Sequence, residues 1–335
     1  MTLPRILRLR DELAEVGVDV DPDSEWGSLL LTELDYAMRP RVHERRVPSV
    51  GAIIQPSTPP TTWEQATGLR VTLRPVDSMP LTGARLFADG VSSWLVRTAD
   101  GTDEWAVFDR PAGSERDLVV MSEAMGATIV QRHPNGSVRV SGSFGVLRWE
   151  GLAWKREPPV AQWIDTLVGL ASDPSIDRDV LETLLEFAVH DLGARGVGAL
   201  LVLGGDTDAD GYANAGGGSA GAGSFQLRLP QPPRLDIRQP ADLAPLRHAL
   251  GQTDGAAVID REGILRQLGV RLVPSPQAEG TVEALRGMRH TSARRYSFDD
   301  ALATVIVVSE DGPVTVLRHG EVLGTSPPRG GGISR

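Results

Sequence analysis

Short alternations of apolar and polar residues run through much of the first half of the chain. Residues 91–110 carry this pattern on both sides of the dipeptide Asp100-Gly101, which favours the tight turn of a strand hairpin. The same alternation returns after the dipeptide Asn135-Gly136. These segments therefore predict pairs of short antiparallel strands.

Helical spacing appears between and before these strands. Residues 114–132 predict a helix followed by a strand, and the apolar residues from Met1 to about Leu34 also predict helix. Residues 40–60 contain several prolines and predict an irregular connector. We therefore expect residues 1–155 to form the smaller, N-terminal α+β domain.

A second pattern begins near Val160. Apolar residues recur at helical spacing in residues 161–173 and 177–195, with Asp177 as a candidate N-cap. Such helices between two sheet-forming regions predict a helical connector over residues 156–180.

The run GVGALLVLGG then fits a strand that is buried on both faces. The glycine-rich segment from Gly204 to Gly223 predicts a loop. Further elements are predicted downstream, namely a short helix at 243–250, two strands within 256–273, partial helix within 282–299, and a hairpin over 303–323 that turns at Asp311-Gly312. The expected class is α/β (α+β), with a mixed sheet flanked by helices over residues 181–326 and a disordered tail at 327–335.

Composition narrows the possible functions. The chain has 335 residues, a net charge of -10 and a pI near 5.2, which disfavours broad binding to DNA. It contains no cysteine, so His and carboxylates remain as its strong metal ligands. No apolar run approaches the roughly 20 residues of a membrane span, and the N-terminus lacks a signal-peptide pattern. We expect a cytoplasmic protein that associates with neither DNA nor membrane.

Tryptophans are concentrated in the first half, where five lie between Trp63 and Trp154. Packing within and along small sheets explains such residues most simply. The alternative is a ligand pocket that uses Trp94, Trp105 or Trp149.

The glycine-rich segment contains a calcium-loop opening, with Asp206, Asp208 and Asp210 ahead of Gly211. A calcium loop of this type also needs a bidentate Glu at its twelfth position, and Gly217 stands there instead. A solvated acidic loop therefore explains the segment better than a calcium site.

Three other segments carry groups suited to phosphate and metal chemistry. Asp254 precedes Gly255, Ala256 and an apolar strand, so its carboxylate can approach a cation closely. Residues 287–295, GMRHTSARR, combine forked Arg donors, a His and hydroxyls at a predicted helix start, where anions bind well. Ser309 and Glu310 follow the predicted strand TVIVV. Taken singly, each segment has an ordinary structural explanation, as a turn or a solvated helix face.

Their order along the chain resembles the diadenylate cyclase domain family. The family has an Asp-Gly-Ala motif, a later Arg-His-Arg motif and a strand that ends near Ser-Glu. Here the matching strings are DGAAVID, GMRHTSARR and TVIVVSE, and the resemblance covers roughly Leu181 to Leu323. It implies metal-assisted condensation of two ATP molecules into cyclic di-AMP and two pyrophosphates.

The resemblance also implies roles for individual residues. Asp254 and Glu310 would hold Mg²⁺ or Mn²⁺, and these two residues with His290 would be catalytic. The implied nucleotide contacts are Gly255, Ala256, Arg289, His290, Thr291, Ser292 and Ser309. Family active sites form between two domains placed face to face, which implies a homo-oligomer.

The sequence departs from the family motif at two positions. Met288 replaces the usual Thr and Thr291 replaces the second Arg, and each change removes a phosphate-contacting group. Loss of a hydrogen bond to a charged group costs about 1.5 to 3 kcal/mol, although Arg294 or Arg295 could supply the missing charge. The alternative function is therefore a weak or inactive module that binds ATP or cyclic di-AMP as a sensor. In either case the N-terminal half resembles a soluble sensor region that regulates the cyclase domain.

Overall fold

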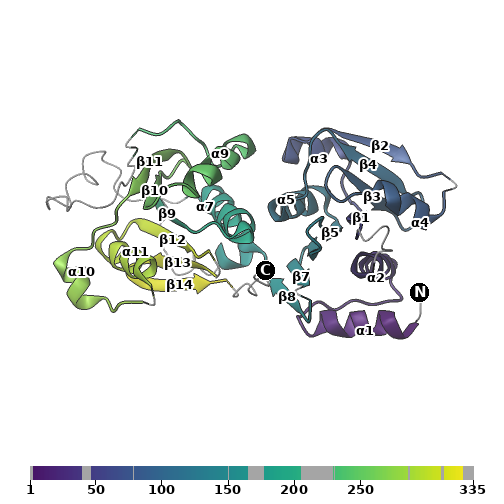
Figure 1. The fold of residues 1–335 in the computed structure, drawn as a ribbon, viewed down its shortest axis with the longest axis horizontal. Helices are drawn as coiled ribbons and strands as arrows, with labels where there is room; N and C mark the ends of the chain where they lie inside the picture. Colours follow the sequence, from purple (N-terminus) through teal and green to yellow (C-terminus); the bar gives the residue numbers. More distant parts are fainter. Residues whose placement is uncertain are drawn as a thin grey trace. The chain divides into compact units, whose positions relative to one another are not determined.

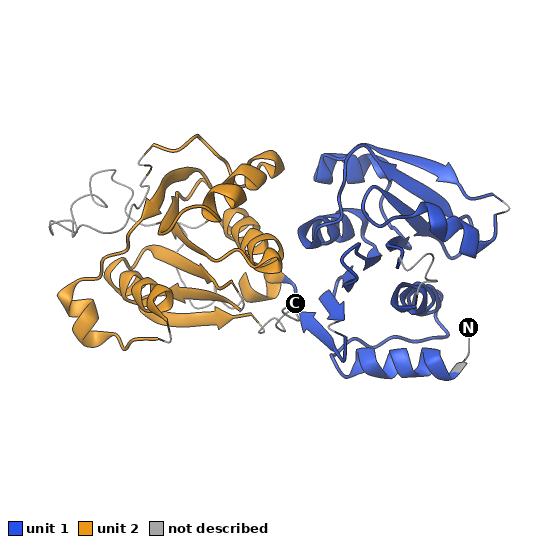
Figure 2. Ribbon diagram, in the orientation of Figure 1, with its two compact units in different colours: residues 1–159 blue, residues 160–335 orange. Residues whose placement is uncertain are grey.

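The computed structural model describes residues 3–39, 47–77, 79–149, 151–164, 177–204, 229, 231–285, 287–310 and 313–326. The chain divides into two compact units, Met1–Pro159 and Val160–Arg335 (Figure 2). Each unit has its own mixed sheet covered by helices, which confirms the predicted α/β class (Figure 1). The calcium-like loop at 206–217, the turn at Asp311-Gly312 and the tail at 327–335 lie outside the described residues.

The sheet of the first unit has the strand order β2-β4-β3-β1-β5-β6-β7-β8. Its strands are β1 (Val50–Ile54), β2 (Val71–Pro75), β3 (Ser93–Arg97), β4 (Glu104–Phe108), β5 (Thr128–Arg132), β6 (Val138–Gly142), β7 (Gly145–Trp149) and β8 (Trp154–Glu157). Only the β1–β3 pair is parallel among these described strands. The predicted hairpins at Asp100-Gly101 and Asn135-Gly136 are confirmed as the β3–β4 and β5–β6 pairs.

The predicted connector at residues 40–60 was wrong in one part. Its run VGAII forms β1, which lies between β3 and β5 in the sheet and is buried along its whole length. The neighbouring prolines, Pro48 and Pro56, delimit this strand instead of excluding it, because they stand outside its hydrogen-bonded residues. The short apolar run between the two prolines was thus a strand signal, and it was overlooked because the segment as a whole is rich in proline.

Helices cover both faces of this sheet. α1 (Leu3–Ala14) and α2 (Glu25–Met38) pack on one face, and α3 (Pro60–Thr67) and α5 (Glu115–Met125) pack on the other, while α4 (Leu81–Ala84) and a 3₁₀ turn (Arg85–Phe87) cover its margin. Ser24 caps α2, and a capping box at Ser114 begins α5. Trp94 is fully buried in the α3/α5 core, and the indole of Trp105 donates to the carbonyl of Ala84 (2.9 Å). Both side chains therefore have packing roles.

Buried carboxylates in this unit are paired with arginines. Glu33 on α2 is 1% exposed, and its oxygens accept from Arg85 (2.8 Å) and from Arg97. Arg85 also lies over the ring of Tyr36, and Arg97 pairs with Asp103 (2.9 Å). This cluster ties α2 to the 3₁₀ turn and to β3.

The second unit has a six-stranded sheet of order β11-β10-β9-β12-β13-β14. The strands are β9 (Ala199–Gly204), β10 (Ala256–Ile259), β11 (Leu265–Val270), β12 (Ala303–Val308), β13 (Val314–Arg318) and β14 (Glu321–Thr325). β9 and β10 run parallel, and the remaining pairs are antiparallel. β9 is buried on both faces, as its apolar run predicted.

Helices again cover the two faces of this sheet. α7 (Arg178–Glu186) continues into a π-helical turn (Phe187–Leu192), and both pack with α9 (Pro240–Leu250) on one face. α11 (Met288–Asp299) packs on the other face, and α10 (Pro276–Thr281) precedes it. Asp177 accepts from the amide of Asp179, which confirms it as the N-cap of α7. The predicted helix at 161–173 lies mostly outside the described residues.

Among the described residues, no helix is both long and apolar enough to cross a bilayer.

Candidate functional site

Three strand ends meet at one edge of the second sheet. β9 and β10 start at this edge, because Ala256 pairs with Leu200 in parallel register. β12 runs the opposite way and finishes at the same edge, because Val308 pairs with Ala199. Asp254, Gly198 and Glu310 therefore occupy equivalent levels just beyond three adjacent strands, and the outer two strands lie about 10 Å apart.

The position of Asp254 depends on the glycine that follows it. Gly255 has φ +97°, and a Cβ there would lie 2.7 Å from the carbonyl carbon of Gly269 and 2.8 Å from the carbonyl oxygen of Val270. Only glycine fits such a close approach to backbone at a positive φ. Asp254 itself is exposed, whereas Ala256 is fully buried at the start of β10. The tight turn thus presents the Asp254 carboxylate to solvent beside a rigid strand.

Arg289 and Glu310 meet over the bare backbone of Gly198. A Cβ at Gly198 would lie 2.6 Å from Nη1 of Arg289 and 2.7 Å from Cγ of Glu310. The same Arg289 nitrogen donates to the carbonyl of Val308 at 3.5 Å, so the guanidinium reaches the end of β12. Because Gly198 has no side chain, the guanidinium of Arg289 and the side chain of Glu310 can both lie over its backbone. Sequence reasoning missed it, because a glycine ahead of a buried strand looks like an ordinary strand boundary.

The first turn of α11 adds hydrogen-bond donors beside Gly198. The helix begins after Gly287, which has φ +99° and provides no side-chain cap. The N–H groups of a first helical turn lack partners within the helix and favour anions. His290 lies in this turn, where burial lowers the pKa of its imidazole and the charge of Arg289 lowers it further. The imidazole is therefore predominantly neutral at neutral pH, and Arg289 supplies the fixed positive charge.

The other residues of the predicted motif have internal roles. Thr291 Oγ1 accepts from the amide of Leu285 (3.1 Å) and lies within hydrogen-bond distance of two carbonyls, at Leu285 (2.9 Å) and Gly287 (3.0 Å). These bonds close the loop ahead of α11. Ser292 and Ser309 are half-buried on α11 and just after β12. Nucleotide contacts of Thr291, Ser292 and Ser309 stay predictions.

Arg294 and Arg295 hold backbone elsewhere in the unit. Arg294 donates to the carbonyl of Gly320 (2.6 Å), and Arg295 donates to the carbonyl of Val282 (3.3 Å). They stabilise the surroundings of α10 and the β13–β14 turn. The expectation that one of them replaces the missing motif Arg therefore has no support in these contacts.

A metal ion at this edge would need ligands from outside the chain. Within the described ranges, no three or more His, Asp or Glu side chains are grouped so that they could hold a metal. Asp254 and Glu310 supply two carboxylates at the same edge, and Mg²⁺ typically takes one or two carboxylates and completes its shell with water and phosphate oxygens. The donor set therefore fits a hard cation that arrives with a phosphorylated ligand.

Two segments of the chain match protein-family models. Residues 7–157 match the family model described as "Probable sensor domain DACNK", and residues 235–322 match the one described as "DisA bacterial checkpoint controller nucleotide-binding". No curated protein matches the chain. A solved structure from Bacillus cereus, described as a hypothetical membrane spanning protein, is 19% identical and covers 45% of this chain and 68% of its own, with a TM-score of 0.30.

The second match contains Asp254, Arg289, His290, Ser309 and Glu310. Gly198 and the strand β9 stand outside it, although β9 lies between β10 and β12.

Proposed function

Because the chain belongs to the diadenylate cyclase domain proteins, we propose that it condenses two ATP molecules into cyclic di-AMP and two pyrophosphates. The observation that carries this proposal is the shared sheet edge, where Asp254 and Glu310 lie beyond the ends of two strands and Arg289 of α11 reaches over Gly198 between them. The edge thus combines carboxylates, which can bind a metal ion or a ribose hydroxyl, with the Arg289 guanidinium, which can bind phosphate. We place the reaction in the cytoplasm, where ATP is available.

In the proposed reaction, the 3'-oxygen of each ATP attacks the α-phosphorus of the other. Asp254 orients that hydroxyl and accepts its proton. Arg289 and the free N–H groups of α11 hold the triphosphate and stabilise charge on the departing pyrophosphate. His290, as a neutral imidazole, donates a hydrogen bond to a phosphate oxygen. Mg²⁺ or Mn²⁺, held by Asp254 and Glu310, would supply Lewis-acid polarisation of the phosphates.

Two copies of the domain are required, since one edge holds one ATP. The groups that would face a second copy are open to solvent, as Asp254, Gly255 and Glu310 are all exposed and Met288 is 89% exposed. We propose that two such edges meet face to face, so that each 3'-hydroxyl reaches the opposite α-phosphate. The sensor family matched by the first unit supports a regulatory role for that unit.

The alternative is a module that binds ATP or cyclic di-AMP without turnover. It is favoured by the motif departures, because Met288 offers no hydrogen bond to phosphate and the hydroxyl of Thr291 is engaged in its own loop. The retained carboxylates at Asp254 and Glu310 favour catalysis, because simple nucleotide binding does not require them.

Incubation of the purified full chain with ATP and either Mg²⁺ or Mn²⁺ tests the proposal directly. We expect cyclic di-AMP and pyrophosphate, identified by chromatography and mass spectrometry, with a rate per chain that rises with protein concentration because two copies must meet. An ATP analogue that lacks the 3'-hydroxyl should bind and yield no cyclic product. If ATP binds but no cyclic di-AMP forms with either metal, the chain is instead a nucleotide-binding module without turnover.

Gly198→Ala tests whether the position of Arg289 over Gly198 matters for ATP binding. The added methyl would overlap Nη1 of Arg289 and Cγ of Glu310, both of which are parts of flexible side chains. We therefore expect the fold to be retained and ATP affinity to fall about tenfold or more, because a charge-assisted hydrogen bond is worth roughly 1.5 to 3 kcal/mol. Isothermal titration calorimetry measures the affinity.

Gly324→Ala in β14 is the matched control, because nothing lies within 4 Å of its Cβ position. Equal ATP affinities for the two variants would remove Gly198 and Arg289 from the site.

A further inference from the structure

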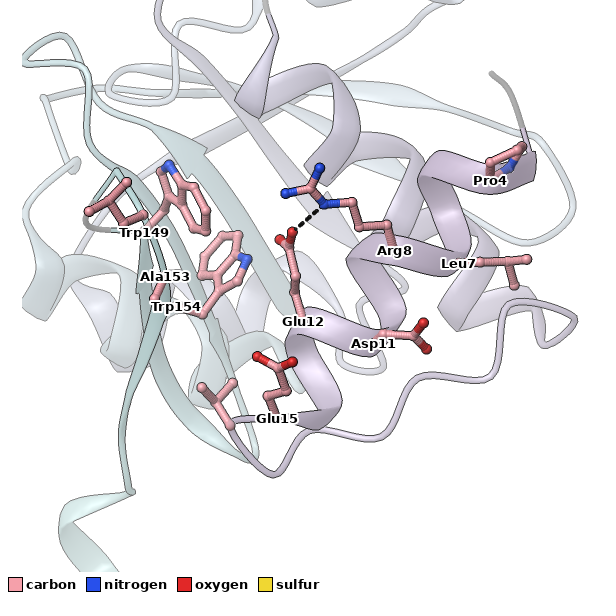
Figure 3. A pocket seen from close by; sticks show the side chains of 11 residues that line it. Pro4, Leu7, Arg8, Asp11, Glu12, Glu15, Trp149, Ala153 and Trp154 are labelled. Carbon is pink, nitrogen blue, oxygen red and sulfur yellow. Dashed lines mark hydrogen bonds and ion pairs between the residues drawn. The ribbon is translucent and has the colours of Figure 1, made fainter.

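A cavity of about 660 Å³ lies in the first unit between α1 and the β7–β8 hairpin. Asp11 and Glu12 of α1 and Glu15 just after it line the cavity on one side, and the hairpin contributes Trp149 and Trp154 (Figure 3). This volume is in the range of pockets that hold small organic molecules. All of its lining residues belong to the unit that matches the sensor family.

The hairpin side of the pocket is aromatic. The rings of Trp149 and Trp154 lie 5.4 Å apart at an angle of 53°, and Leu152 at the hairpin turn is 95% exposed. Trp154 is 4% exposed, and among the described residues its Nε1 has no hydrogen-bond partner. That nitrogen is out of reach of solvent, so the indole rings, and not this N–H group, form the aromatic side of the pocket.

The helix side of the pocket is acidic. Among the described residues that line it, three are carboxylates and one is a cation, Arg8, which pairs with Glu12 at 2.8 Å. Asp11 pairs with Arg10 at 2.6 Å, whereas Glu15 is exposed in the turn that follows α1. The excess negative charge disfavours anionic ligands and attracts cations.

Contacts at both ends of α1 keep the pocket open. Arg5 pairs with Asp35 on α2 (2.7 Å), and Arg156 on β8 donates to the carbonyl of Gly17 (3.0 Å) and to that of Phe144 (2.9 Å). The helix is thus fixed to α2 near its start and to the sheet just beyond its end. A ligand would therefore meet a preformed site, which reduces the entropic cost of binding.

We propose that this pocket binds a small organic cation. Its positive group lies against the indole of Trp149 and the carboxylates of Glu12 and Glu15. Electron-rich indole faces and nearby carboxylates are the groups that recognise ammonium and guanidinium ions.

The pocket also has a direct covalent connection to the second unit. Trp154 begins β8, the last strand of the first unit, and the chain passes from β8 through Pro158-Pro159 into Val160. A ligand held on β8 would stabilise the strand that leads into the cyclase domain. This regulatory meaning rests on the proposed function, whereas binding itself does not.

Calorimetric titration of the full chain without ATP tests the site independently of catalysis. The probes are choline, agmatine and spermidine, with 3,3-dimethylbutan-1-ol as the uncharged analogue of choline. We expect at least one cation to bind saturably at one per chain. Glu15→Gln and Trp149→Ala should each weaken it about tenfold. If choline binds, its uncharged analogue should bind at least about tenfold more weakly.

Asp19→Asn is the matched control, since Asp19 is exposed just beyond α1 and does not line the pocket. Glu15→Gln changes an exposed side chain, so it keeps the test valid even if Trp149→Ala alters packing. The proposal is overturned if none of the three cations binds, if neither variant weakens binding, or if the uncharged analogue binds as well as choline.

Discussion

Asp254→Asn is expected to abolish formation of cyclic di-AMP while ATP still binds. The substitution replaces a carboxylate with an amide of the same size on an exposed turn, so the fold should not change. An amide is a poor base and a weak ligand for Mg²⁺, and loss of general-base assistance alone costs about 10²- to 10⁴-fold in rate. We therefore expect at least about a 10³-fold lower rate of product formation, measured by mass spectrometry, with ATP affinity within a few-fold of wild type.

The design of this experiment needs one precaution. Asparagine followed by glycine deamidates readily, and Asn at position 254 would precede Gly255. The intact mass of the variant should therefore be checked, and Asp254→Ala assayed in parallel. Glu262→Gln, an exposed acid beyond the opposite end of β10, is the control and should keep full activity. Undiminished product from both Asp254 variants would show that this carboxylate has no part in the reaction.

Glu33→Gln should cause the largest loss of stability, about 3 to 5 kcal/mol in the free energy of unfolding of the first unit. Glu33 is 1% exposed and accepts from both Arg85 and Arg97, which are 7% and 11% exposed. Removal of its charge leaves Arg85 buried without an ionic partner, and breaking a buried pair typically costs this much. Urea denaturation followed by tryptophan fluorescence measures it, since Trp163 is the only tryptophan beyond the first unit.

Glu25→Gln on the same helix is the control, because Glu25 is exposed and its loss should cost less than about 1 kcal/mol. Combining Glu33→Gln with Arg85→Gln should cost less than the sum of the single changes, since the second change removes the stranded charge. Additive costs would mean that the two side chains do not depend on each other.

The sequence was sufficient for most elements because their signals are local. Alternating strands with Asp-Gly and Asn-Gly turns, the cap at Asp177 and the apolar run of β9 all follow from neighbouring residues. β1 was missed because its strand signal is only five residues long and prolines stand nearby. Its position in the centre of the sheet depends on pairing with β3 and β5, which no local pattern reveals.

The candidate site likewise contains residues that the sequence could indicate and others that only the folded chain reveals. Asp254, Arg289 and Glu310 were recognisable because the family motif fixes their residue types and order. Gly198 has no such motif, and its importance comes from two side chains that are distant in sequence and reach the same backbone. The hydroxyl of Thr291 was predicted to contact nucleotide, but its bonds to the preceding loop depend on a chain path that composition cannot supply.

The place of β9 in its sheet has a consequence for synthesis of the chain. β9 pairs with β12 through contacts such as Val202 with Val305, so its partner leaves the ribosome about 100 residues later. At typical elongation rates of 5 to 20 residues per second, this interval lasts roughly 5 to 20 s. Both edges of β9 are unpaired until β10 has been made, and the edge that faces β12 stays unpaired until the end of the interval, so this largely apolar strand is open to association with other nascent chains. Premature termination between the two strands would make that exposure permanent, so truncated products should be prone to aggregation and rapid degradation.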